Sequence, residues 1–337
     1  MNPLFRSTAF ALIAYAAPLA AQDVTLKVHH FMSETSVLHA EVLIPFEEAI
    51  EAASGGRIEI ELYASMSLGG RPGDLYDQAA DGAADIILTL PGYTAGRFNR
   101  TEVFELPFLM SDTIAGSKAF YELVATDLQN GEYDETHILS AWLHSPGQIH
   151  AEDPVATLED LSGREMRGPT RVVTDLLGEL GATPVGMPLP LIPENLSKGV
   201  ISGAALPWEI TPSIRMAELV SNHTQFGDGN VFYTATFVLA MNLDVYDDLP
   251  DDLRAILDDA TGKAMAELAG TVMVSADEAG RAVASENKII TLDAAETARW
   301  IKASAPVYDR WIERANGEGF DGIAAITQAR DLIAANQ

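Results

Sequence analysis

The sequence predicts an α/β protein built from two lobes, because strand-like and helix-like segments alternate and a long helical pattern follows them. A chain of 337 residues with 47% hydrophobic side chains is long enough to fill two ordinary hydrophobic cores, which excludes disordered and fibrous classes. The sequence contains no internal repeat and no Pro/Ser-rich linker, so we expect interwoven lobes rather than lobes joined by a tether.

The first half of the chain carries the alternation of strands and helices. We expect strands at 24–28, 58–63, 84–90 and 166–169, and helices at 37–53, 71–81 and 172–181. Gly168 and Pro169 end the strand that carries Arg167 abruptly and begin a loop. Ligands of open parallel sheets bind beyond the carboxyl ends of the strands, so the loops after these strands are the expected binding region.

A single long helix is expected to follow, from residue 251 to about 285. Asp251 and Asp252 suit a helix N-terminus, and apolar side chains then recur at helical spacing without an intervening proline. Such a helix would be roughly 45 Å long, enough to brace two lobes. A strand at 289–292 and helices at 294–315 and 322–335 complete the predicted chain.

The first 21 residues have the pattern of a signal peptide. Arg6 supplies a positive charge, residues 9–17 are apolar and too few to span a membrane, and residues 18–21 offer small side chains for cleavage. A cytosolic amphipathic helix is the alternative, although the segment has no polar face. We expect a mature chain that begins near Gln22 or Asp23 and resides in the bacterial periplasm.

The charge balance constrains the partners. The chain has 21 basic and 49 acidic side chains, and removal of residues 1–21 takes away only Arg6, which leaves a net charge of −29. Nucleic acid and anionic lipid are excluded as partners, because both require clustered cations. An anionic ligand would need a local, partly buried cation, and Arg167 at its strand end is the candidate. A salt bridge between the lobes is the alternative role for this arginine.

No motif in the sequence indicates catalysis, a metal or a cofactor. Gly317, Gly319 and Gly322 fit G-x-G-x-x-G but follow a helix instead of a strand, which indicates a helix stop. The chain has no cysteine, its seven histidines form no H-E-x-x-H pair, and Ser202 lacks the G-x-S-x-G context. The aspartate pairs between 247 and 259 are typical of a solvated surface. We expect no catalytic residue, metal or cofactor.

Seven short motifs are distributed along the chain. They are SLGG (67–70), GAADI (82–86), FELPFL (104–109), LEDLSGREMR (158–167), LGATPV (180–185), LSKGVI (196–201) and YDDLP (246–250). Together they resemble the solute-binding subunits of tripartite ATP-independent periplasmic (TRAP) transporters, the DctP-like family. The resemblance covers essentially the whole chain after the signal peptide.

This resemblance implies a two-lobed periplasmic binding protein fold, in which each lobe is a sheet flanked by helices and a long helix spans both lobes. We place lobe I at residues 22–143 plus about 232–271, and lobe II at 144–231 plus about 272–337. The implied function is to capture a small organic acid in the periplasm and to deliver it, unchanged, to the membrane subunits of a TRAP transporter. The mature chain itself would not insert stably into the membrane.

The resemblance also implies that Arg167 grips the carboxylate of the ligand. Many relatives have a second arginine about twenty residues upstream, where this chain instead has Gln148, and an asparagine that the segment 201–209 lacks. Gln148 can donate a hydrogen bond to a ligand but cannot neutralise a second anion. We therefore expect a monocarboxylate, such as an aromatic, keto or hydroxy acid.

Further residues complete the expected ligand-binding set. The aromatic residues expected at strand ends, with core packing as the alternative for each, are Phe31, Tyr93, Trp208, Phe232 and Tyr233. His30 is expected to face the site, and Glu209 would repel an anion unless a cation or a ligand hydroxyl lay between them. A periplasmic enzyme that uses His30 or His144 with an acid for proton transfer, or a sensor module, is the alternative function.

Overall fold

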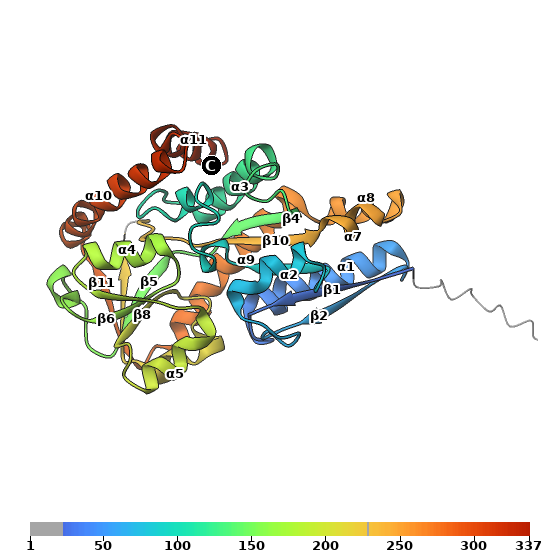
Figure 1. Cartoon of the computed structure of the whole chain (residues 1–337). Coiled ribbons are helices and arrows are strands. Elements are labelled where there is room, and N and C mark those ends of the chain that lie inside the picture. Colours follow the sequence, from blue (N-terminus) through green and yellow to red (C-terminus); the bar gives the residue numbers. More distant parts are fainter. Residues whose placement is uncertain (1–22, 228) are drawn as a thin grey trace, which may run out of the picture.

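The computed structural model describes residues 23–227 and 229–337, and its strands form two sheets (Figure 1). The expected signal peptide lies outside the described residues. One sheet has the strand order β2-β1-β3-β10-β4 and the other the order β11-β9-β5-β8-β6-β7. Helices flank both sheets, as the predicted α/β class with two lobes requires.

The first sheet takes its strands from two stretches of the chain. They are β1 (Val24–His30), β2 (Ile58–Tyr63), β3 (Ile86–Thr89), β4 (Thr136–Leu143) and, from much later, β10 (Thr236–Asn242). β1 pairs in parallel with β2 and β3, while β10 runs antiparallel between β3 and β4. Its helical segments are a π-helical turn (His39–Leu43), α1 (Ile44–Ser54), α2 (Leu75–Ala80) and α3 (Thr113–Leu123) with its π-helical extension Val124–Leu128.

The second sheet is built in the same way. Its strands are β5 (Gly147–Ala151), β6 (Glu165–Gly168), β7 (Thr183–Gly186), β8 (Gly203–Pro207), β9 (Asn222–Phe226) and β11 (Lys288–Leu292). β6 runs parallel to β7 and β8, whereas β5 is antiparallel to β8 and β9. Its helices are α4 (Arg171–Glu179), α5 (Ile192–Ser197) and α6 (Met216–Leu219).

The helix predicted from 251 to 285 is two helices, which corrects that expectation. After the short α7 (Leu243–Asp248), α8 (Asp251–Ala260) ends and α9 (Gly262–Val283) begins in a new direction. The break lies at Thr261 and Gly262, because the φ of +68° at Gly262 is a left-handed conformation that does not occur in the interior of an α-helix, so Gly262 can only start a new one. Ser140 Oγ donates a hydrogen bond of 2.8 Å to the Gly262 carbonyl and holds the turn against β4.

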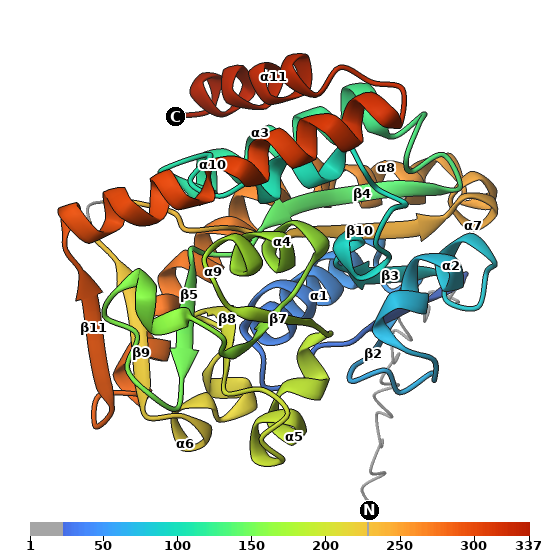
Figure 2. The same ribbon diagram turned by 60° about the vertical axis from the view of Figure 1, so that its left-hand side comes forward.

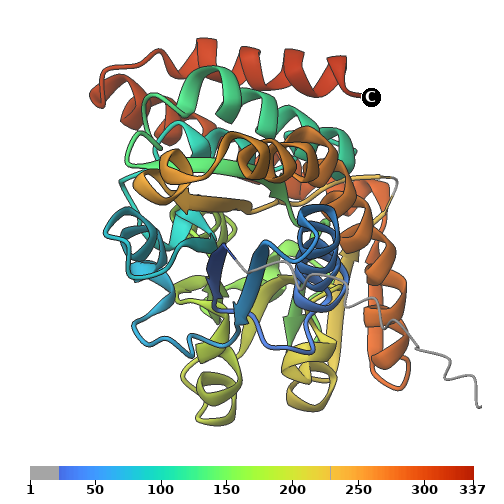
Figure 3. The same ribbon diagram turned by 90° about the vertical axis from the view of Figure 1, so that its right-hand side faces the viewer.

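α9 is the helix that spans both lobes. Near its start, a Cβ on Gly270 would lie 2.8 Å from Ser117 Oγ of α3, on the side of the first sheet. Near its end, a Cβ on Gly280 would lie 2.1 Å from the carbonyl oxygen of Trp208, in the loop after β8. Both contacts require the absence of a side chain, so the helix packs closely on each lobe. Figure 3 shows α9, in orange, along one side of the molecule.

Two further helices cover the top of the molecule, as Figure 2 shows. α10 (Ala294–Gly317) packs on α4, where Arg314 Nη1 donates to Asp175 at 2.6 Å, and α11 (Gly322–Ala335) returns over α3. The glycine-rich segment between them is the predicted helix stop, with Gly319 at φ +90°. Within residues 23–227 and 229–337, no helix has the length and apolar character needed to span a membrane.

Candidate ligand-binding site

A cavity lined by residues of both sheets lies where the strand ends of the two sheets face each other. The first sheet and the segment leading into it supply Phe31, Met32, Leu90, Tyr93, Tyr233 and Phe237. The second sheet and its loops supply Arg167, Pro169, Leu189, Leu206, Pro207, Glu209 and Ile210, and His144 joins them from the connection between β4 and β5. The lining is therefore largely apolar, with a few polar groups, as in most small-molecule sites.

Arg167, at the end of β6, is the cation of this cavity. It is 2% exposed, its Nε donates to the Met187 carbonyl at 2.9 Å, and its Nη1 donates to the Ala205 carbonyl at 3.0 Å. No carboxylate in the described part of the chain lies within ion-pair distance of the guanidinium. Burial lowers the pKa of Arg167, yet arginine stays charged in proteins. A buried unpaired charge costs several kcal/mol, so this side chain is prepared for an anion.

Two tyrosine hydroxyls accompany the guanidinium. Tyr93 accepts a hydrogen bond from the Leu189 N–H at 3.1 Å, whereas the Tyr233 hydroxyl is buried without a partner. Burial raises the pKa of both phenols, and the nearby Arg167 charge only partly opposes this, so both remain neutral O–H donors. Gly147 fixes the second ring, because a Cβ there would lie 2.1 Å from Tyr233 Cε1. The cluster offers several donors to one anion.

His144 has no free ring nitrogen. Its Nε2 must accept the hydrogen bond from the Ala235 N–H at 3.0 Å, so Nδ1 carries the proton and donates to the Ser145 carbonyl at 2.5 Å. Burial lowers the pKa of His144 to about 4, which keeps the ring neutral. The ring packs edge-on against Tyr233, with centroids 5.3 Å apart. This side chain therefore positions its neighbours and cannot exchange a proton with a ligand.

Glu209 and Asp277 form a buried pair of carboxyl groups at the cavity wall. Asp277 Oδ1 accepts hydrogen bonds from Ser145 Oγ at 2.6 Å and from the Glu209 N–H at 2.9 Å. Burial raises the pKa of Asp277 to about 6. Burial, and then the adjacent Asp277, raises the pKa of Glu209 well above its usual range. Asp277 accepts two hydrogen bonds that stabilise its charged form, whereas Glu209 Oε2 accepts none, so Glu209 is the carboxyl group of this pair that holds a proton.

Two of the expected ligand contacts, Gln148 and Trp208, lie outside the residues that line the cavity. The Gln148 amide donates to a nearby backbone carbonyl at 3.1 Å and accepts from the Phe226 N–H at 3.3 Å, so it links two strands. The Trp208 indole N–H donates to Gln225 at 3.3 Å, and its ring meets His150 edge-on at 4.9 Å. Trp208 points away from the cavity, whereas its chain neighbours Pro207 and Glu209 line it.

Two more of the expected residues, Phe232 and His30, are buried in the protein core and do not line the cavity. Phe232 stacks on Phe226 with centroids 4.6 Å apart and meets Trp300 edge-on. His30 Nε2 lies 3.0 Å from His39 Nδ1, and burial lowers the pKa of His30 to about 3. The remaining predicted residues do line the cavity, namely Phe31, Tyr93, Arg167, Glu209 and Tyr233.

Sequence reasoning did not single out the apolar remainder of the lining. Met32, Leu90 and Pro169 lie within two residues of the carboxyl end of a strand, so the rule that found Phe31 applies equally to them. Phe237 lies inside β10, and no local pattern distinguishes it from a core residue.

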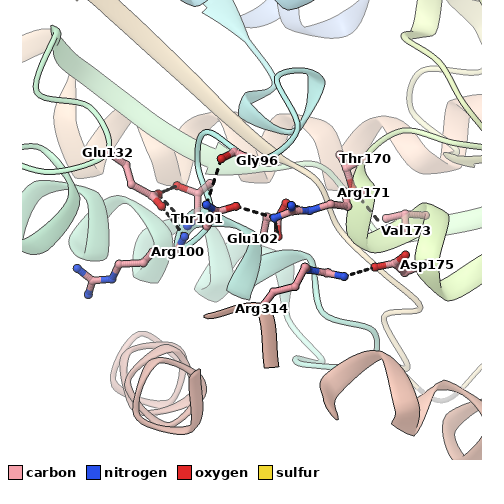
Figure 4. A network of polar contacts seen from close by, with 11 residues as sticks. Gly96, Arg100, Thr101, Glu102, Glu132, Thr170, Arg171, Val173, Asp175 and Arg314 are labelled. Carbon is pink, nitrogen blue, oxygen red and sulfur yellow. Dashed lines mark hydrogen bonds and ion pairs between the residues drawn. The ribbon is translucent and has the colours of Figure 1, made fainter. Parts of the chain in front are cut away.

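A hydrogen-bonded clasp closes the molecule beside the cavity (Figure 4). Arg171, the first residue of α4, donates from Nε and Nη2 to the two carboxylate oxygens of Glu102, each at 2.9 Å. Its Nη2 also donates to Asn99 at 2.6 Å. Glu102 is only 5% exposed and lies in the 3₁₀ turn Thr101–Glu105, next to the first sheet. The bidentate pair thus joins segments that accompany different sheets.

The two sides also touch directly. A Cβ on Gly92 would lie 2.4 Å from Thr170 Cγ2, so the backbone after β3 packs against the N-cap of α4 without an intervening side chain. The structure is accordingly that of a closed molecule. In the described part of the chain, no group of three His, Cys, Asp or Glu side chains is arranged to hold a metal ion.

A closed, largely apolar cavity with one buried cation between two α/β lobes defines a two-lobed solute-binding protein. The chain belongs to the bacterial extracellular solute-binding protein family 7, whose model matches residues 28–314. The family and the similar solved structures described below are solute-binding proteins, not enzymes.

Three comparisons illustrate the similarity. A TRAP solute-binding protein from Rhodoferax ferrireducens, solved with copurified benzoate, is 47% identical, covers 93% of this chain and 98% of its own, and superposes with a TM-score of 0.90. A marine metagenome TRAP solute-binding protein described as specific for aromatic acids, solved with metahydroxyphenylacetate, is 39% identical over 93% of this chain and 99% of its own, with a TM-score of 0.91. A solute-binding protein of Albidiferax ferrireducens is 23% identical over 70% of this chain and 71% of its own.

Proposed function

We propose that this protein captures a small monocarboxylate between its two lobes in the periplasm and delivers it to the membrane subunits of a TRAP transporter. The observation that carries the proposal is Arg167, a fully buried cation without a carboxylate partner in the described part of the chain. An anionic ligand supplies the missing charge, and the hydroxyls of Tyr93 and Tyr233 add donors to the same carboxylate.

The body of the ligand is apolar and compact. Aromatic and aliphatic side chains, among them Phe31, Leu90, Ile210 and Phe237, form the rest of the cavity wall. An aromatic acid fits this description, and the benzoate and metahydroxyphenylacetate found in the similar structures support it.

A dicarboxylate does not fit. Arg167 is the cation among the residues that line the cavity, and the opposite wall carries Glu209 with Asp277 behind it. A second carboxylate would be buried without a counter-charge, at a cost of several kcal/mol.

Ligand contacts to both lobes explain closure. We propose the lobes at residues 22–143 plus about 232–271 and 144–231 plus about 272–337, with residues 1–21 as the export signal. Arg167 then belongs to lobe II, while Phe31 and Tyr93 belong to lobe I. A ligand that touches both favours the closed state by the difference between its affinities for the closed and open states.

Calorimetry with benzoate tests the proposal on wild type and Arg167→Met. We expect the variant to lose binding by at least about 100-fold, the equivalent of about 3 kcal/mol for charge-assisted hydrogen bonds. The unfolding temperature of the ligand-free variant should change little, because the substitution also removes a buried charge. Arg71→Met, which alters an exposed arginine, is the matched control and should bind as wild type does. Equal affinities of Arg167→Met and wild type for every acid that binds would refute the proposed role.

A further inference from the structure

Glu209 is a polar residue of the cavity that has no role in binding the carboxylate of the ligand. Its side chain lines the cavity, the residue is 5% exposed, and Oε2 is buried with no hydrogen-bond partner. A buried unpartnered oxygen normally costs about 1–3 kcal/mol. Such a group in a binding cavity indicates that the ligand provides the partner.

The surroundings of Glu209 define what that partner must be. Asp277 accepts two hydrogen bonds and holds negative charge behind Glu209, while the cation at Arg167 forms no ion pair with either acid. Glu209 therefore presents a neutral carboxyl group, with one O–H donor and one carbonyl acceptor. Arg167, Tyr233 and Glu209 all line the cavity, so the cation and the neutral acid are two polar groups of one site.

We propose that Glu209 recognises a hydroxyl group on the ligand, so that the preferred ligand is a hydroxylated monocarboxylic acid with an apolar, ring-sized body. The inference rests on the proposed function, in which Arg167 binds the carboxylate. A hydroxyl both donates and accepts, and so matches a neutral carboxyl group. A ligand without it leaves Glu209 Oε2 unpartnered, and this difference creates the selectivity.

Other groups match less well. A second carboxylate would lie beside the Asp277 charge and gain no cation. An ammonium group on the ligand has three N–H donors and needs several acceptors. Of the carboxyl oxygens of Glu209 and Asp277, Glu209 Oε2 is the buried one without a hydrogen-bond partner, which is too few acceptors for such a group.

The test compares benzoate with the 2-, 3- and 4-hydroxybenzoates by calorimetry on wild type, Glu209→Leu and Glu209→Gln. In wild type, at least one hydroxybenzoate should bind about tenfold more tightly than benzoate. Glu209→Leu should still bind benzoate, but the ratio of the Kd for benzoate to the Kd for that hydroxybenzoate should fall to about one. Glu209→Gln is the matched control, because its amide keeps one donor group and one acceptor and should retain the preference.

The outcomes separate the two proposals. If benzoate binding requires Arg167 but the hydroxybenzoate ratio is the same in wild type and Glu209→Leu, this inference is wrong and the proposed function stands. A preference of the wild type for 3-(aminomethyl)benzoate over every hydroxybenzoate would also overturn it. If no acid of the series binds, or if binding does not depend on Arg167, the proposed function itself fails.

A second measurement does not depend on the folding of Glu209→Leu. The infrared difference spectrum of wild type should contain the band of a protonated carboxyl group that Glu209→Gln lacks. This band should shift with the preferred hydroxybenzoate and stay in place with benzoate. Absence of the band, or equal shifts with both ligands, would contradict the inference.

Discussion

The clasp between Arg171 and Glu102 should set how tightly the protein holds its ligand. In the closed molecule the guanidinium makes two hydrogen bonds to a carboxylate that is 5% exposed. Charge-assisted hydrogen bonds contribute about 1.5–3 kcal/mol, and the Arg171 side chain is 26% exposed, so solvent weakens them. We take about 2 kcal/mol for the clasp in the closed state. Arg171→Met should therefore weaken ligand binding about 30-fold, because binding requires closure.

Calorimetry with the best-binding acid on three variants checks this magnitude. Arg171→Met leaves the Glu102 carboxylate buried and unpaired on closure, and the double variant with Glu102→Gln removes that charge, so its affinity should return toward wild type. Arg310→Met is the matched control, because Arg310, in α10, forms its ion pairs with Asp175 and Glu179 of α4 and does not connect α4 to the first sheet. An affinity of folded Arg171→Met within twofold of wild type would refute the reasoning.

Two further predictions concern stability. Burial raises the pKa of Glu105 to about 8, so the folded protein keeps a proton that the unfolded chain loses near pH 4.5. The stability that this proton contributes is fully present below pH 4.5 and is lost as the pH rises toward 8. In urea unfolding, the stability of wild type relative to Glu105→Gln should fall by about 1.4 kcal/mol per pH unit between pH 5 and 8, and a constant difference would contradict the assignment. Gly280→Ala should destabilise the protein by about 1–3 kcal/mol, because its Cβ would collide with a backbone oxygen 2.1 Å away. Gly317→Ala, at a position with open space around it, should be neutral or stabilising, and equal effects of the two substitutions in thermal unfolding would argue against close packing of α9.

Side-chain periodicity predicted most of the fold. The strand at 58–63 and the helix at 322–335 have the predicted bounds, because each has a clear period and turn residues at its ends. The break before α9 was missed because Gly262 interrupts a helical pattern whose apolar spacing continues across it. A single glycine inside such a pattern is compatible with a continuous helix, and the contact of its carbonyl with the distant Ser140 leaves no local signal in the sequence.

The sequence does not show which of the candidate side chains line the cavity, and the reason is geometric. Trp208 and Glu209 are neighbours, as are Phe232 and Tyr233, and in each pair one side chain lines the cavity while the other packs elsewhere. Successive side chains of an extended segment point in opposite directions, so only one residue of each pair can face the cavity. The local sequence does not show which one, because the other wall of the cavity comes from a distant part of the chain. Contacts such as Arg171 with Glu102 join residues 69 positions apart and leave no local pattern.

The distribution of cations has a kinetic consequence. Arginines at the surface, such as Arg57, Arg97 and Arg299, are each paired with two acids, and the net charge of the chain is −28. An approaching organic anion therefore meets a repulsive field until it reaches the buried guanidinium of Arg167. At 0.1 M salt the screening length is about 10 Å, so added salt weakens the repulsion between the protein surface and the approaching anion. The ion pair between the bound anion and the buried Arg167 is screened much less. Capture should accordingly become faster with ionic strength while release changes little, the reverse of an electrostatically steered encounter.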